Sequence, residues 1–208
     1  MSTLLHIEVS PSGANSVSRS VAGEFVSAWQ AEHPGGIVVL RDLAVNPAPH
    51  LDEESLKASF TPEDQRTEGM KSKLAYRMEL IDEIKAADHI VIATPMWNWS
   101  VPSVLKAYFD QIILKGTLDA NRAKGLTGKK VTYVVAQGSS YGPGAPREGW
   151  DHTTGFLRHI ASVLGSDDIE IIVAEYTLAG VAPGMEAFTE SKESSIASAK
   201  KAARLRAA

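Results

Sequence analysis

Residues 90–110 read IVIATPMWNWSVPSVLKAYFD, a short apolar run followed by an aromatic loop and then by a helical pattern. The run at 90–93 predicts a buried strand, and the apolar spacing over 101–114 predicts a helix. The Trp-Asn-Trp sequence at 97–99 would lie directly after the carboxyl end of that strand. Open α/β sheets bind their ligands at this edge. Two large aromatic side chains in such a loop therefore indicate a flat ligand, and a planar cofactor is the first hypothesis.

The alternation of strand and helix continues along all 208 residues. Apolar runs and helical spacing predict strands over residues 4–9, 37–40, 89–93, 131–136 and 169–174, and helices over residues 19–32, 70–86, 101–114, 150–164 and 186–207. This alternation predicts an α/β sandwich of three layers, in which a parallel sheet carries helices on both faces. Five parallel strands fit the flavodoxin-like order 2-1-3-4-5, in a single domain covering residues 1–208.

A long polar connection at residues 42–69 separates the second strand from the next long helix, with a short helix near 53–58. Connections of this length inside a compact domain are usually lids or interface elements. We therefore expect this segment to serve a substrate site or an interface.

The composition excludes several classes of function. A net charge of −4 offers no electrostatic attraction to nucleic acid. The absence of cysteine removes disulfides and thiolate sites, and the six histidines are too scattered to predict a metal site. The first residues lack the pattern of a signal peptide, and no apolar run approaches the ~20 residues that a membrane span needs. A cytoplasmic protein without a membrane partner is expected.

The loop after the first strand, residues 10–19, reads SPSGANSVSR and leads into a helix. Serine hydroxyls and backbone N–H groups at a helix N-terminus form an anion site. The loop lacks both the ending of a Walker P-loop and the spacing of the dinucleotide fingerprint. It therefore fits a single phosphate. A plain N-cap role for Ser16 or Ser18 explains the same residues equally well.

Two further loops would lie at the same edge of the sheet. Asn98 and the indoles of Trp97 and Trp99 offer hydrogen bonds and a shield for a heterocycle, although packing in the core or in a dimer interface also explains both indoles. Gln137 ends the fourth strand, and Gly138 allows close approach of a ligand to the backbone. An amide there could bind a pyrimidine-like edge; the alternative is a plain glycine-rich turn.

The three loops together describe a mononucleotide that carries a flat heterocycle. One loop offers a site for one phosphate, and the other two offer walls for a ring. FMN satisfies this description better than ATP, because nothing in the sequence is arranged for a triphosphate.

The sequence resembles a known family along nearly its whole length. The residues that carry the resemblance are Ser10 with Ser16-Val17-Ser18, Arg41-Asp42-Leu43-Ala44 with Asn46-Pro47, Pro95-Met96-Trp97-Asn98-Trp99, Val101-Pro102 with Leu105-Lys106 and Tyr108-Phe109-Asp110, and Leu126 with Gly128-Lys129-Lys130. They resemble the FMN-dependent NAD(P)H azoreductases, also called NAD(P)H:quinone oxidoreductases. The loop after the third strand is the most specific part of the match.

The resemblance implies a homodimer with one FMN per subunit at the interface. The FMN-binding residues that it implies are Ser10, Ser16, Val17 and Ser18 for the phosphate, Met96, Trp97, Asn98 and Trp99 for the isoalloxazine, and Gln137, Gly138, Ser139 and Ser140 for backbone contacts. The last four depart from the Ser/Ala-Arg-Gly-Gly-like run of many members. Phe60 falls where relatives reach across the dimer to cover the partner's flavin, and Tyr141 is a second candidate for that role.

The resemblance also implies the activity. NADH or NADPH would reduce FMN, which in turn reduces a quinone by two electrons or cleaves an aromatic azo bond to amines, by ping-pong hydride transfer. Two-electron reduction would protect against electrophilic quinones. No acid or base is obligatory, so we name no catalytic side chain. The alternative is a flavodoxin-like electron carrier. Such carriers tend to be smaller and strongly acidic, and the long segment at residues 42–69, which could cover a substrate slot, also argues against this alternative.

Overall fold

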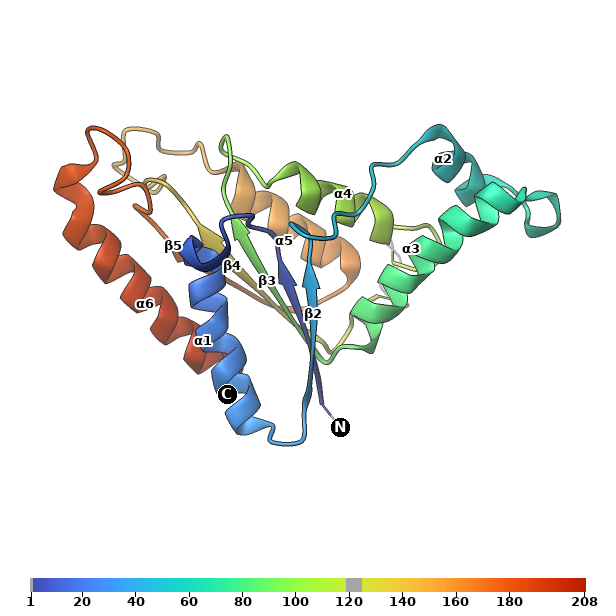
Figure 1. Cartoon of the computed structure of the whole chain (residues 1–208), viewed down its shortest axis with the longest axis horizontal. Helices are drawn as coiled ribbons and strands as arrows, with labels where there is room; N and C mark the ends of the chain where they lie inside the picture. The colour runs from blue at the N-terminus through green and yellow to red at the C-terminus, as the bar shows by residue number, and fades with distance from the viewer. Residues whose placement is uncertain (1, 119–124) are drawn as a thin grey trace.

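The protein is described by a computed structural model that covers residues 2–118 and 125–208. Five parallel strands form one sheet in the order β2-β1-β3-β4-β5, which confirms the predicted order. The strands are β1 (Thr3–Glu8), β2 (Ile37–Asp42), β3 (His89–Pro95), β4 (Lys130–Ala136) and β5 (Asp168–Ala174). Their carboxyl ends meet at one edge of the sheet, opposite the edge at which both chain termini lie (Figure 1).

Helices cover both faces of the sheet. The helices are α1 (Val17–Glu32), α2 (Glu53–Phe60), α3 (Glu68–Ala86), α4 (Ser103–Ile112), α5 (His152–Leu164) and α6 (Thr189–Ala207), with short 3-10 turns η1 (Gly13–Asn15), η2 (Glu63–Gln65) and η4 (Glu186–Phe188). One apolar cluster joins α1 and α6 to the sheet, and a larger cluster joins α3, α4 and α5 to its other face. The predicted three-layer α/β class is therefore confirmed.

Capping residues explain where the helices begin. The predicted start at residue 19 lies two residues inside α1, because the Ser16 side chain caps the helix by accepting from the Arg19 N–H. The α5 helix begins at His152 rather than at residue 150, because Asp151 accepts from the N–H groups that follow it. Helix caps are local interactions that hydrophobic spacing does not encode.

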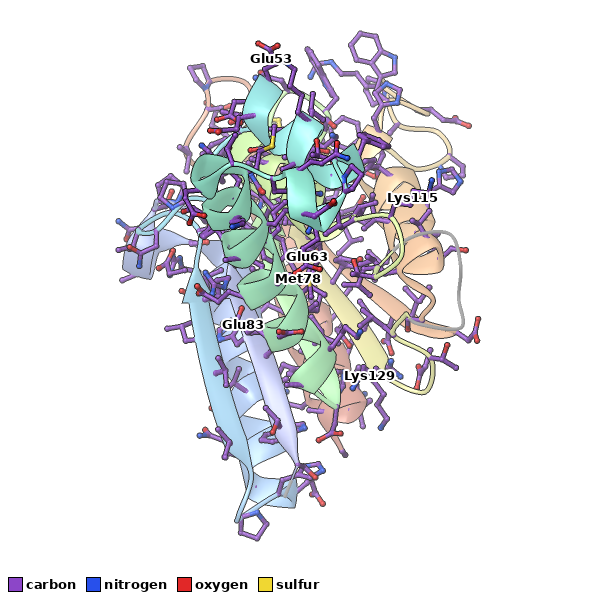
Figure 2. All side chains as sticks on the ribbon, turned by 90° about the vertical axis from the view of Figure 1, so that its right-hand side faces the viewer. Glu53, Glu63, Met78, Glu83, Lys115 and Lys129 are labelled. Atoms are coloured by element: carbon purple, nitrogen blue, oxygen red, sulfur yellow. The ribbon has the colours of Figure 1, made fainter. Side chains whose placement is uncertain are left out.

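The α2 helix lies away from the sheet, beyond the amino end of α3 (Figure 1). This α2–α3 arm is attached through α3: the Arg41 guanidinium of β2 donates to Glu83, at 3.0 Å for the Nη2 contact. Figure 2 shows this side of the molecule, with Glu83 on α3 next to the strands and Glu53 at the far end on α2. Of the helices in the described ranges, none combines the length and the apolar character that crossing a membrane requires.

Candidate functional site

A cavity of about 490 Å³ lies at the carboxyl edge of the sheet. This is within the range of small-molecule sites in proteins. Its lining comes from the loops after β1, β3, β4 and β5, and consists of Ser10, Ser12, Asn15, Ser16, Val17, Pro95, Met96, Trp97, Asn98, Ala136, Gly138, Thr177, Leu178 and Val181. The three loops singled out in the sequence thus converge on one cavity. Within the described part of the chain, no charged residue lines this cavity.

The first wall of the cavity is the loop from Ser10 to the start of α1. The first helical hydrogen bond runs from the Ser20 N–H to the Ser16 carbonyl, and the Arg19 N–H donates to the Ser16 hydroxyl. The N–H groups of Val17 and Ser18 therefore lie at the open end of the helix, where they are free of intrahelical partners. Such an end attracts anions. Ser18 itself does not line the cavity: its side chain is fully buried, and its hydroxyl lies 3.1 Å from that of Ser16.

Arg19 stabilises this loop through hydrogen bonds and ion pairs. Its Nε and Nη2 donate to the Ser10 carbonyl oxygen at 2.9 and 2.6 Å. The same guanidinium pairs with Glu8 and with Asp42, the latter at 2.8 Å. Because Asp42 ends β2, one side chain joins two strand ends to the start of α1. Burial, helped by Arg19, lowers the pKa of the adjacent His6 to about 4, so this imidazole is neutral at pH 7.

The second wall contains a tight turn at residues 97–100. Trp97 and Ser100 exchange two backbone hydrogen bonds, of 2.9 and 3.0 Å, and the two central residues have positive φ angles of 48° at Asn98 and 65° at Trp99. Positive φ at both positions defines a type I′ turn. Asn tolerates this conformation, but a tryptophan there is strained, and such strain clusters at functional sites.

The turn sends the two indoles in different directions. The Trp97 side chain, which is 45% exposed, lines the cavity together with Met96 and Asn98. Trp99 does not line it; its ring meets the Trp150 ring edge-on, with the centroids 5.2 Å apart. One of the two indoles is therefore available to a ligand in this cavity, and the other packs against an aromatic neighbour.

The third wall differs from the interpretation of Gln137 made from the sequence. The Gln137 side chain is 2% exposed and donates to Asp151 at 2.9 Å, so its amide faces α5 rather than the cavity. Successive strand residues point to opposite sides of a sheet, and here Ala136 and Gly138 face the cavity instead. A Cβ at Gly138 would lie 2.6 Å from the Cδ1 of Leu178, so a larger residue at this position would force the Leu178 side chain to move. Ser139 and Ser140 line a neighbouring cavity.

Sequence reasoning missed the fourth loop of the site. Thr177, Leu178 and Val181 line the cavity from the segment after β5. The sheet topology could have predicted their position, since β5 ends at the same edge as the other parallel strands. The segment has no motif of its own, and for this reason it was not predicted.

Comparison with known proteins identifies the family of this chain. A family model for the flavodoxin-like fold matches residues 2–200. The FMN-dependent NADH:quinone oxidoreductase of Frankia alni is 46% identical over 210 residues, with complete coverage of both chains. The protein of the same name from Nostoc sp. is 40% identical, covering 97% of this chain and 96% of the relative.

Solved structures show the same fold. An azoreductase from Bacillus anthracis superposes with a TM-score of 0.86 at 21% identity, covering 100% of this chain and 99% of that chain. An FMN-dependent NADH-azoreductase from the same species, solved with FMN, superposes with a TM-score of 0.82 at 22% identity, with complete coverage of both chains. The match of the family model and the close sequence relatives together show that this chain belongs to the FMN-dependent NADH:quinone oxidoreductase family, within the flavodoxin-like fold.

Proposed function

We propose that this protein uses bound FMN to reduce quinones with NADH or NADPH, and to cleave aromatic azo compounds to amines. In the first reaction one NADH, one proton and one quinone give NAD⁺ and one hydroquinone. In the second, two NADH and two protons give two amines and two NAD⁺ per azo bond. One observation carries the proposal: a single cavity combines the free N–H groups that begin α1 with the exposed indole of Trp97.

The phosphate of FMN fits the first wall of the cavity. We assign it to the hydroxyls of Ser10 and Ser16 and to the N–H groups of Val17 and Ser18. The described residues that line the cavity are uncharged, which favours one phosphate, since a triphosphate with its metal ion would need charged partners. Helix N–H groups suffice for a single phosphate dianion.

The isoalloxazine fits the second and third walls. Met96 and the Trp97 indole provide an apolar surface, and the Asn98 amide can both donate to and accept from a heterocycle. Gly138 lets the ring approach the backbone. The other predicted contacts, at Trp99, Gln137, Ser139 and Ser140, remain proposals. Because the Gln137 side chain donates to Asp151, the contact proposed for Gln137 is through its backbone.

When bound, FMN takes two electrons from a reduced nicotinamide and gives them to a quinone or an azo compound. Among the described residues, those that line the cavity include no acid or base, and the role proposed for them is to hold the reactants in position. Position and electrostatics are the usual protein contributions when a cofactor carries the chemistry.

We propose that the active form is a homodimer that covers the flavin. The α2–α3 arm carries the exposed apolar side chains of Leu56 and Phe60, which are 50% and 74% exposed in the single chain. Exposed large apolar side chains grouped on a projecting element favour an interface. Phe60 is our candidate for covering the flavin of the partner, and Tyr141 is the alternative. A cytoplasmic location suits a reaction that draws on reduced nicotinamide.

Anaerobic titration of the FMN-loaded protein with NADH tests the proposal. The flavin absorption band is expected to bleach, and to return when a benzoquinone or an aromatic azo dye is added. If FMN binds but NADH does not bleach it, the protein is an electron carrier and the proposed function is wrong. A protein that does not bind FMN would contradict both readings.

A further inference from the structure

A second cavity, of about 530 Å³, adjoins the first. The loop that follows β4 separates the two cavities, with Gly138 lining the first and Ser139 and Ser140 lining the second. Its other walls come from the same loop and from the segment between β5 and α6, and consist of Pro143, Gly144, Ala145, Pro146, Arg147, Tyr176, Met185 and Phe188. Tyr176 directly precedes Thr177 of the first cavity, so both edges of this second cavity adjoin the FMN site.

Among the described residues, Arg147 is the one charged residue that lines this second cavity. Within the described residues, no carboxylate lies within ion-pair distance of its guanidinium. Three acidic residues directly adjoin lining residues in sequence, namely Glu148, Glu175 and Glu186. Glu148 accepts from the Gly144 N–H at 2.9 Å and Glu186 from the Gly184 N–H at 3.2 Å, whereas Glu175 lines a different cavity. The guanidinium lies over the Trp150 ring, 6.0 Å from the ring centroid. This contact uses the face of the guanidinium, so its fork of N–H donors is available to an anion.

An aromatic wall lies in the same cavity. The rings of Tyr176 and Phe188 are stacked, with centroids 5.3 Å apart and planes 11° apart. Tyr176 has a φ of 57°, a conformation that is costly for a residue other than glycine or asparagine. Phe188 is 38% exposed, so the stack leaves aromatic surface open to a ligand. A flat apolar wall, serine hydroxyls and one free cation match a nucleoside phosphate.

We propose that this second cavity binds the adenosine diphosphate half of the reduced nicotinamide dinucleotide. The adenine packs against the Tyr176–Phe188 stack, and Arg147 binds a phosphate. The nicotinamide end then crosses the Gly138–Ser140 loop and reaches the flavin in the first cavity. This inference rests on the proposed function, because it assumes that a dinucleotide is the reductant.

Comparison of two reductants tests the inference in the FMN-loaded protein. NADH carries the adenosine diphosphate half, whereas N-benzyl-dihydronicotinamide carries only the reacting ring. In the variant Arg147→Met, the NADH concentration for half-maximal flavin reduction is expected to rise about 10-fold, as loss of a charge-assisted hydrogen bond predicts. The limiting rate and the reaction with N-benzyl-dihydronicotinamide should not change. Phe188→Ala should show the same selective loss.

Arg158→Met is the matched control. Arg158 is an exposed arginine on α5 outside both cavities, and its replacement changes the net charge equally. The control is expected to behave as the wild-type protein with both reductants. Unchanged NADH dependence in Arg147→Met and Phe188→Ala would overturn the inference. So would an equal loss with both reductants, or a loss confined to an anionic azo dye, which would assign the cavity to the acceptor.

A separate binding measurement keeps this inference distinct from the proposed function. ADP-ribose carries the adenosine diphosphate half without the reacting ring, and calorimetry can follow its binding to the FMN-loaded protein. Binding by the wild-type protein that weakens about 10-fold in Arg147→Met supports the cavity assignment, even if no nicotinamide reduces the flavin. Absence of ADP-ribose binding, together with normal reduction by NADH, would overturn the inference and leave the proposed function intact.

Discussion

The guanidinium of Arg19 donates two hydrogen bonds, of 2.9 and 2.6 Å, to the carbonyl oxygen of Ser10. This relationship sets the shape of the proposed phosphate site, because Ser10 lies in the loop directly after β1 and Arg19 lies in the first turn of α1. The charge of Arg19 is compensated by Glu8 and Asp42, so the side chain serves the loop as a brace rather than as a phosphate ligand.

Replacement of the brace should weaken both the fold and cofactor binding. In Arg19→Met the carboxylates of Glu8 and Asp42, 13% and 18% exposed, lose their partner. We expect the free energy of unfolding to fall by about 3 kcal/mol, and the dissociation constant of FMN to rise. Urea unfolding and fluorescence titration measure the two effects. Asp42→Asn is the control: it keeps the Arg19–Ser10 bonds, so FMN affinity should fall less. Equal FMN affinity in Arg19→Met and wild type would contradict the bracing role.

Ser16→Ala should lose stability and FMN affinity together. Its hydroxyl caps α1, and loss of an N-cap costs about 1 kcal/mol. Thr67 makes the equivalent bond at the start of α3, accepting from the Met70 N–H at 3.2 Å, far along the chain from the cavity. Thr67→Ala should therefore lose similar stability with unchanged FMN affinity. If both variants bind FMN equally well, Ser16 is only a helix cap.

Two variants separate the backbone role of Asn98 in the turn from the role of its side-chain amide. Asn98→Gly keeps the positive φ without strain, whereas Asn98→Ala should cost about 1 kcal/mol in the left-handed region. If the amide contacts the isoalloxazine, both variants lose FMN affinity, although only the alanine variant loses thermal stability. Wild-type affinity in Asn98→Gly would show that the residue serves the turn alone.

Replacement of Arg77, which lies outside the cofactor site, should cause a large loss of stability. Its guanidinium is 3% exposed and donates to the carbonyls of Asp110, Gln111 and Ile113 at the end of α4, and to the Ser59 hydroxyl of α2. Arg77→Met leaves these acceptors without their donor, and we expect a loss of about 3 kcal/mol. Thermal unfolding of the FMN-free protein is the measurement. A change below about 1 kcal/mol would show that α4 does not depend on this cap.

The protein should lose stability in mild acid because His6 and His89 are buried. Burial lowers the pKa of His6 to about 4 and that of His89 to about 3, whereas both lie near 6.5 in the unfolded chain. Below about pH 6.5 the unfolded state therefore binds more protons, and the free energy of unfolding falls as the pH falls.

Between about pH 6.5 and about pH 5, each histidine should lower the free energy of unfolding by about 2 kcal/mol. Urea unfolding across this range measures the slope, and His89→Gln, which keeps a polar partner for Thr132, should make it shallower. A slope that is unchanged in the variant would exclude His89 as a cause.

Much of the fold follows from periodicity. The apolar run of β3 is buried at all but its last residue, as a central strand requires, and the five strands and their order were predicted. The two helices of the α2–α3 arm were also predicted, near residues 53–58 and 70–86. The position of α2 away from the sheet was not, because it depends on contacts between distant residues. Arg77 and Ser59 lie 18 positions apart, and no local pattern encodes their hydrogen bond.

The convergence of the three loops could also be predicted, because the carboxyl ends of parallel strands meet at one edge. The direction of individual side chains could not. The left-handed turn at Asn98 and Trp99 decides that Trp97 and not Trp99 lines the cavity. The bond to Asp151, 14 positions along the chain, decides that the Gln137 amide faces α5.

A crystal structure of the protein grown with FMN tests the proposed site most directly. The FMN phosphate is expected within hydrogen-bonding distance of the N–H groups of Val17 and Ser18, with the isoalloxazine against Trp97 and Asn98. A phosphate bound away from the start of α1, or a ring that leaves the cavity between the β1 and β3 loops empty, would contradict the site.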